Sequence, residues 1–379
     1  MMITTADVER LLRARSPGPS VLSVYVRAPH DPPALRGLPA RVEELIASAR
    51  RAPAEDREVA AGQDEARHVA RRLLEVHARE WLGHTVAIFA CGEPQLAETF
   101  VLPGAFEDRA VFATRPHVRP LLVALQRFPG YCVAIVDGPY AWAFRVTGER
   151  IDRLAPPAAA GAGGTGFGGW YGVESRRLNE RVTQLARHSC RDTAAALGPI
   201  LRGGTLPLVV GGHPHDTPQF LAELADDVAD QVVDSFAVDA HTVTPSRARD
   251  LADQVIARSA GVRERRLVTE LVQERHRGLA AIGLQACLDA VNQRAAELLV
   301  VPENEMIPGF VCQRCGTLGS TGTDCQDWGA ASAAVPDLIE EMVLAAMRDG
   351  AQVEATSDPP GGIAARLRFP LDSWDAQTA

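Results

Sequence analysis

The 379-residue sequence contains no lysine, so all 39 of its basic side chains belong to arginine. A genome biased against lysine codons is the simplest explanation. Whatever its origin, the absence excludes chemistry that depends on a lysine amine: a Walker A phosphate-binding loop, a Schiff-base enzyme and a lysine nucleophile. Arginine is therefore the only strongly basic side chain that this sequence offers to phosphate.

Long apolar runs are also missing. No stretch of about eighteen apolar residues, the length that crosses a bilayer, occurs in the sequence. Residues 1–10 lack the basic region followed by an apolar run that marks a signal peptide. We therefore expect a cytoplasmic protein with no membrane partner. Neither a Gly-x-Ser-x-Gly elbow nor a His-Glu-x-x-His pair occurs, so nothing obvious encodes a self-contained hydrolase.

The charge balance is acidic, with a formal net charge of -9 and a pI near 5.6. Such a surface is unsuited to general binding of polyanions, so any contact with nucleic acid requires a local basic patch. Hydrophobic residues make up 46% of the chain and charged residues 23%. These values are ordinary for a soluble protein of two or three globular domains.

The seven cysteines are an odd number, which fits reduced thiols better than a disulfide framework. Three of them cluster as Cys312-Gln-Arg-Cys315-Gly, followed by Cys325-Gln-Asp-Trp328-Gly. Two Cys-x-x-Cys-Gly knuckles would predict structural zinc, but an indole stands at the fourth position and cannot coordinate the metal. Zinc on Cys312, Cys315 and Cys325 stays an alternative, with Asp324, Asp327 or water as a fourth ligand. A degenerate knuckle without a cofactor is favoured.

Strand and helix patterns divide the chain into three α/β regions, residues 1–128, 129–258 and 259–379. In the first region, β-branched and aromatic runs flank a helical repeat. The third region contains two predicted strands, at 296–302 and 363–369, with an amphipathic helix between them.

The central region begins with a predicted β-hairpin over 131–146. A tract of alanine, proline and glycine follows, and then a stretch from Glu174 to about Leu197 that has the periodicity of a helix. A strand at 206–210 and a helix at 219–235 are predicted next. The spacing Gly161-x-Gly-x-x-Gly within the tract matches a dinucleotide-binding motif, but the motif does not follow a strand, so we exclude that interpretation.

The predicted helix beginning near Glu174 carries a basic ridge. Leu178, Val182, Leu185 and Ser189 form one stripe at helical spacing, and a basic and polar stripe lies beside it. These arginines are either solvated and partly neutralised by nearby carboxylates or in contact with RNA. The RNA interpretation is favoured because the ridge directly follows the glycine-rich tract.

Gly168, Gly169 and Trp170 stand just before this helix. In the archaeo-eukaryotic class I peptide chain release factors and their paralogue Pelota, a Gly-Gly-Gln loop and a long basic helix occupy the matching places. The chain resembles this superfamily over most of its length, most strongly at 131–256 and 312–369. It resembles the bacterial archaeo-eukaryotic release factor family more closely. The resemblance implies an RNase H-like central domain and a C-terminal domain similar to the L7Ae-like third domain of release factors.

Two departures from the superfamily shape the expected function. Trp170 stands where the water-positioning glutamine would be, and a chain without lysine cannot contain the lysine-bearing stop-codon motif of the eukaryotic factors. We therefore expect a ribosome-binding factor that occupies the A site in hibernation, protection or stalled-ribosome recognition, rather than in codon-specific termination. The implied partners are ribosomal RNA, P-site tRNA and, through the third domain, a translational GTPase.

The resemblance places six side chains where they would hold phosphates of ribosomal RNA or tRNA: Arg176, Arg177, Arg181, Arg187, His188 and Arg191. Trp170 either stacks on a base or packs back onto its own domain. Two further functions stay open. Backbone N–H groups of the Gly168-Gly169-Trp170 loop could stabilise developing charge, so ribosomal hydrolysis of peptidyl-tRNA is the enzymatic alternative. A ribosome-independent interaction scaffold is the other.

Overall fold

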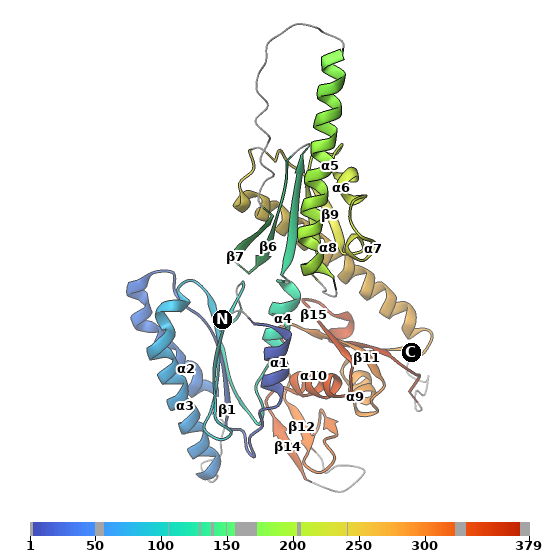
Figure 1. Cartoon of the computed structure of the whole chain (residues 1–379). Helices are drawn as coiled ribbons and strands as arrows, with labels where there is room; N and C mark the ends of the chain where they lie inside the picture. Colours follow the sequence, from blue (N-terminus) through green and yellow to red (C-terminus); the bar gives the residue numbers. More distant parts are fainter. Residues whose placement is uncertain are drawn as a thin grey trace. The chain divides into compact units, whose positions relative to one another are not determined.

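The computed structural model describes residues 3–49, 57–104, 106–128, 130–137, 140–148, 150–155, 173–202, 206–240, 242–322 and 331–371 (Figure 1). The chain divides into two compact units. Unit 1 contains residues 1–128 together with 266–379, and unit 2 contains residues 129–265. The first and third predicted regions therefore contribute to one compact unit, although each has its own sheet.

The first sheet of unit 1 is four-stranded and antiparallel, in the order β3-β2-β1-β4. Its two central strands are buried along almost their whole length, because helices cover both faces (Figure 1). The elements are α1 (Thr5–Leu12), β1 (Val21–Arg27), η1 (Pro32–Gly37), α2 (Leu38–Ala49), α3 (Arg57–His77), η2 (Ala78–Trp81), β2 (Thr85–Cys91), β3 (Leu96–Leu102), β4 (Arg109–Ala113) and α4 (Arg119–Arg127).

The second sheet of unit 1 has the order β10-β16-β11-β15, with β11 and β15 parallel. A small three-stranded sheet, β13-β12-β14, lies between β11 and α10 in the sequence. The elements are β10 (Ala280–Ile282), α9 (Leu284–Asn292), β11 (Ala296–Pro302), β12 (Gly309–Cys312), β13 (Leu318–Gly319), β14 (Ser332–Val335), α10 (Leu338–Arg348), β15 (Gln352–Thr356), η3 (Pro360–Gly362) and β16 (Ala364–Leu367).

Side chains from both segments of unit 1 meet in a shared core. Leu344 of α10 is buried in the same cluster as Val118 and Leu121 of the first segment. The Gln126 amide on α4 donates to the Val353 carbonyl at 2.6 Å and accepts from the Ala355 N–H at 2.8 Å. Gln126 thus satisfies backbone groups of β15, which lies at the edge of its sheet.

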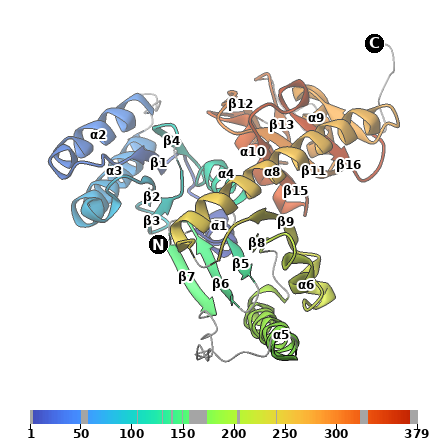
Figure 2. The same ribbon diagram turned by 90° about the horizontal axis from the view of Figure 1, so that it is seen from above.

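Unit 2 is built on a five-stranded sheet in the order β7-β6-β5-β8-β9. Strands β5, β6 and β7 are antiparallel, whereas β8 and β9 run parallel to β5. Figure 2 shows α5 and α8 on opposite faces of this sheet, where each covers its own apolar cluster. The elements are β5 (Tyr131–Asp137), β6 (Tyr140–Thr147), β7 (Arg150–Ala155), α5 (Val173–Leu201), β8 (Leu208–Gly212), α6 (Thr217–Leu221), α7 (Asp226–Ala229), β9 (Val232–Ala237) and α8 (Pro245–Arg275), whose last residues belong to unit 1.

The predicted α/β class is confirmed, and so are the hairpin and the long helix of the central region. The prediction of one helix over 219–235 is wrong. Two short helices occupy its first part, and Ala225 between them is extended, with φ -68° and ψ 150°. The last part forms β9, because the β-branched pair Val232-Val233 suits a strand that can join β8 at the sheet edge.

Candidate functional site

The glycine-rich tract and the first turns of the following helix contain many of the predicted site residues. Gly168, Gly169 and Trp170 lie outside the described residues. Helix α5 begins at Val173, so its first turn follows Trp170 closely in the chain. Arg176, Arg177 and Arg181 lie on the first turns of α5, and their side chains are outside the described part as well. Their predicted contacts with RNA therefore stay predictions.

The second half of α5 packs on the sheet of unit 2 through a face of small and apolar side chains. Ala186, Ser189, Cys190, Thr193 and Leu197 are buried along this face. The predicted apolar stripe included Leu185, but that side chain is 49% exposed. The prediction was wrong at this position because the helix is rotated so that Ala186 and Cys190, rather than Leu185, face the sheet.

Three basic side chains of the predicted ridge are described, and they differ in their neighbours. The Arg191 Nε lies 2.8 Å from Glu223 Oε2, and this ion pair raises the pKa of Arg191. The His188 Nε2 lies 3.5 Å from Asp192 Oδ2, with both side chains largely exposed. Arg187 is exposed and forms no ion pair within the described residues. Exposed ion pairs such as these contribute little to stability.

The cysteine knuckle forms a tight turn at the end of β12. The Gly316 N–H donates to the Cys312 carbonyl, and the Cys312 N–H donates to the Thr317 carbonyl, each at 2.9 Å. Cys312 is buried and Cys315 is exposed, with its Sγ 3.0 Å from Thr317 Oγ1. Cys325 lies outside the described residues, so the predicted three-thiolate zinc site stays untested.

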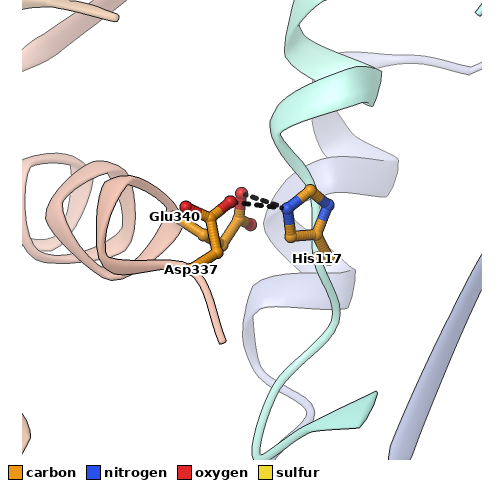
Figure 3. A group of neighbouring side chains, drawn as sticks. All are labelled: His117, Asp337 and Glu340. Atoms are coloured by element: carbon orange, nitrogen blue, oxygen red, sulfur yellow. Dashed lines mark hydrogen bonds and ion pairs between the residues drawn. The ribbon is translucent and has the colours of Figure 1, made fainter. Parts of the chain in front are cut away.

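A group of buried charged side chains that sequence reasoning missed lies within unit 1. It consists of His117, Arg119, Asp337 and Glu340, and we call it the buried ionic cluster. Figure 3 shows His117 facing Asp337 and Glu340. The His117 Nε2 lies 3.0 Å from Asp337 Oδ2 and 3.6 Å from Glu340 Oε2. Arg119 is wholly buried, and its Nη2 lies 2.7 Å from the same Asp337 Oδ2.

The two carboxylates of this cluster each occupy a helix N-terminus. Asp337 is the N-cap of α10 and accepts from the Ile339 N–H at 3.1 Å. Glu340 reaches across to α4, where it accepts from the N–H groups of Val118 at 2.5 Å and Arg119 at 3.2 Å. The residues that begin α4 thus receive their cap from the other segment of unit 1, which stabilises the unpaired N–H groups and the positive end of the helix dipole.

Its neighbours in this cluster keep the Asp337 carboxylate ionised. Burial alone would raise the pKa of Asp337, but the hydrogen bond from His117 and the Arg119 charge outweigh it and hold that pKa below its usual value. The Arg119 guanidinium also donates to the Pro302 and Glu305 carbonyls, at 3.3 Å and 2.5 Å. Burial of a charged side chain is costly unless it is paired and hydrogen-bonded, and these contacts meet that condition for Arg119.

The ligand atoms of His117, Asp337 and Glu340 lie within 4.8 Å of one another, which is close enough to suggest a metal site. The donor set argues against it. All four carboxylate oxygens already accept hydrogen bonds, and the His117 Nε2 that faces them must carry a hydrogen to donate. The Arg119 guanidinium already places a positive charge 2.7 Å from Asp337 Oδ2. We therefore interpret the cluster as an anchor between the two segments of unit 1.

A local signal for part of this cluster is present in the sequence. Asp337-Leu-Ile-Glu340 has the acidic spacing of a helix N-terminus, so the start of α10 was predictable. The pairing with His117 and Arg119 was not, because no local pattern links positions more than 200 residues apart.

No helix in the part of the chain that the structure describes is long and apolar enough to span a membrane.

A family model matches the middle of the chain. Residues 116–276 match the model of the bacterial archaeo-eukaryotic release factor family 10. This match confirms the resemblance to the release-factor and Pelota superfamily that the sequence predicted. It leaves the Gly-Gly-Gln correspondence untested. No curated protein matches the chain.

The chain is also similar to solved structures. One is a model of ribosome-bound archaeal Pelota and ABCE1, at 15% identity and a TM-score of 0.41, covering 98% of this chain and 95% of that one. A crystal structure of the archaeal translation termination factor aRF1 has 15% identity and a TM-score of 0.25, with 96% of each chain covered. The translation termination-like factor Dom34 of S. cerevisiae has 9% identity and a TM-score of 0.41, covering 79% and 84%. All of these similarities are distant.

Proposed function

We infer that this chain, whose residues 116–276 match a bacterial family of release-factor relatives, is a release-factor-like protein of translation. We propose further that it binds the ribosomal A site in hibernation, protection or the recognition of stalled complexes. The family match carries the proposal, because it spans the whole of unit 2, including α5 and the glycine-rich tract that precedes α5 in the sequence.

The charge of α5 supports a contact with RNA in a chain that is otherwise acidic. Arg187 is exposed and unpaired among the described residues, and Arg191 can leave Glu223 for a phosphate at little cost. In the proposed complex, the Gly168-Gly169-Trp170 loop lies toward the peptidyl transferase centre, and the first sheet of unit 1 lies toward the decoding centre. Arg176, Arg177 and Arg181 hold ribosomal RNA or tRNA phosphates beside Arg187.

Two sequence features favour occupancy of the A site over termination. Trp170 has no amide with which to position a hydrolytic water, whereas its ring could stack on a base. The absence of lysine removes the stop-codon motif of the eukaryotic factors. Delivery by a translational GTPase that contacts residues 259–379 belongs to the same proposal.

Co-sedimentation with bacterial ribosomes tests this function. We expect the full-length protein to pellet with ribosomes at low salt, and an Arg187→Glu variant to pellet several-fold less. Arg258→Glu is the matched control, because Arg258 is also exposed in unit 2 but lies on α8. Failure to pellet at low salt would overturn the proposal and favour the ribosome-independent scaffold. Equal losses in both variants would show that α5 is not the contact.

The glycines before α5 favour one enzymatic alternative, hydrolysis of peptidyl-tRNA. A programmed ribosome that carries a labelled peptide distinguishes the two functions. The A-site proposal predicts no release above the background. Release that is lost in Gly169→Ala and kept in Gly261→Ala would instead establish the enzyme. Gly261 lies on α8, and a β-carbon there meets only the Arg265 Nη1 at 3.6 Å, an ordinary contact.

A further inference from the structure

A cavity of about 640 Å³ lies within unit 1, and none of its lining residues is among the proposed RNA contacts of α5. The loop after α1, the end of β4, the cysteine knuckle and helix α10 form its wall. This volume is within the range of pockets that hold small molecules, about 300–1,000 Å³.

Four arginines line this cavity: Arg15, Arg115, Arg314 and Arg348. The one acidic side chain on the described wall is Glu341. Arg348 also lies 3.5 Å from Asp349, which is outside the lining. Arg15 and Arg115 form no ion pair within the described residues. The chain as a whole has a net charge of -9. The cavity wall, with four arginines and one glutamate, is therefore a local positive patch.

The backbone brings Arg15 and Arg115 side by side. The Ser16 N–H donates to the Thr114 carbonyl at 2.9 Å, so Arg15 and Arg115, which flank this bond, lie on neighbouring segments of the backbone. Burial, followed by the charge of Arg15, lowers the pKa of Arg115, and Glu341 opposes this effect. The guanidinium groups therefore repel one another, and an anion bound among them would relieve the repulsion.

Helix α10 supplies the opposite wall. Glu341, Leu344, Ala345 and Arg348 follow the spacing of one helix face and all line the cavity. Apolar side chains line the wall at Pro17 and Pro19 and at Ala333 to Pro336, and Thr114 and Gln313 add neutral polar groups. A ligand with a flat apolar part and a strongly anionic part fits this combination.

The neighbouring buried ionic cluster holds the cavity in place. Arg115 stands two residues before His117, and Glu341 directly follows Glu340. The hydrogen bonds of the cluster therefore fix both backbones that carry the charged wall. A site whose supporting residues are already ordered loses less entropy when a ligand binds.

We propose that this cavity binds a phosphate-bearing ligand of nucleotide size, with Arg15 and Arg115 as the principal phosphate contacts and the apolar wall against the base. Guanidinium groups match phosphate oxygens in pairs, with two parallel hydrogen bonds. Glu341 limits the affinity, because its carboxylate faces the same space. This proposal is independent of the ribosome contact.

Calorimetric titration of the full-length protein without ribosomes tests the site, with ADP, inorganic phosphate and a short single-stranded RNA as probes. We expect ADP to bind saturably below about 1 mM and to bind at least tenfold more weakly in Arg115→Ala. Arg15→Ala should weaken it in the same direction, and since Arg15 is exposed, that variant should keep the fold. Glu341→Gln should strengthen binding. Arg79→Ala, an exposed arginine elsewhere in unit 1, should change nothing.

The outcomes separate the sources of the phosphate. Binding of RNA but not ADP, with the same loss in Arg115→Ala, would support a phosphate site and assign it to a nucleic-acid backbone. Binding of inorganic phosphate as strong as that of ADP would contradict the role of the apolar wall and overturn the nucleotide assignment. The site itself would be refuted if no probe binds saturably, or if both arginine variants bind as well as the unaltered protein.

Discussion

Arg119 is wholly buried, and a guanidinium group leaves water at a cost of several kcal/mol unless partners replace the lost hydration. Asp337 supplies the opposite charge, and the Pro302 and Glu305 carbonyls accept further hydrogen bonds. Arg119 and Asp337 stabilise the fold only as a pair. Without its partner, either one would be a buried, unpaired charge.

Asp337→Asn should destabilise unit 1 by about 3–5 kcal/mol, because it leaves a buried cation without its charge partner. Chemical denaturation near neutral pH measures the loss. Asp31→Asn is a suitable control, since Asp31 is also an N-cap residue of unit 1 but its side chain makes no capping hydrogen bond. The low pKa of Asp337 means that this stabilisation is present above the usual carboxyl range and is lost as the pH falls through the lowered value. An Asn variant as stable as the original would contradict the anchor interpretation.

Glu341 should behave in the opposite way. Burial and the neighbouring Glu340 raise the pKa of Glu341 from 4.5 to about 6. Its ionisation therefore costs nothing below about pH 4.5, and the full cost is reached above about pH 6, on the order of 2 kcal/mol. Glu341→Gln should stabilise the protein by up to this amount at about pH 7.5, and by much less at about pH 4.5. Unfolding curves at the two pH values measure the difference, and an equal effect at both would be inconsistent with the raised pKa.

Elements with a strong local pattern were predictable, and those that depend on a distant partner were not. The run after Glu174 has no helix breaker before Gly198, so α5 was evident. β9 was missed because its residues 232–237 alternate weakly and become a strand only beside β8. The buried ionic cluster was missed for a similar reason. Its helix start at Asp337 has a local signal, but its contact with Arg119 depends on tertiary packing.

The junction of β5 and β8 provides a prediction at the scale of an element. A β-carbon on Gly212 of β8 would lie 1.9 Å from the Val136 carbonyl oxygen of β5, so the two strands would have to separate. Gly212→Ala should destabilise unit 2 by about 1–3 kcal/mol. Gly261→Ala, within helix α8, has room for the methyl group and should stabilise it by about 0.5–1 kcal/mol. Thermal unfolding followed by circular dichroism gives both signs, and a shared sign would contradict the close approach.

At the scale of the whole molecule, unit 2 is inserted between the two segments of unit 1. Each unit has its own apolar clusters. Unit 2 therefore has the packing of an independent folding unit, whereas residues 1–128 lack the carboxylates that neutralise Arg119 and cap α4.

A fragment of residues 129–265 should therefore fold alone and unfold cooperatively, whereas a fragment of residues 1–128 should aggregate or remain partly unfolded. Far-ultraviolet circular dichroism and size-exclusion chromatography distinguish these states. In the full-length protein, Asp337→Asn should lower the unfolding temperature of one unit only. Cooperative unfolding of the 1–128 fragment at the temperature of the intact protein would contradict this division.

The 218 residues that separate Arg119 from Asp337 in the chain also set an order of events during synthesis. At about 5–20 residues per second, a ribosome needs about 10–40 s to make the stretch between them. During that time unit 2 emerges and can fold. Arg119, beside the first sheet, has no carboxylate partner until Asp337 is made. Maturation of unit 1 is thus delayed until Asp337 and Glu340 have left the exit tunnel. In a chain truncated before Asp337, burial of Arg119 would be unfavourable, so the segment around it would stay open. Chaperones and proteases recognise such open segments.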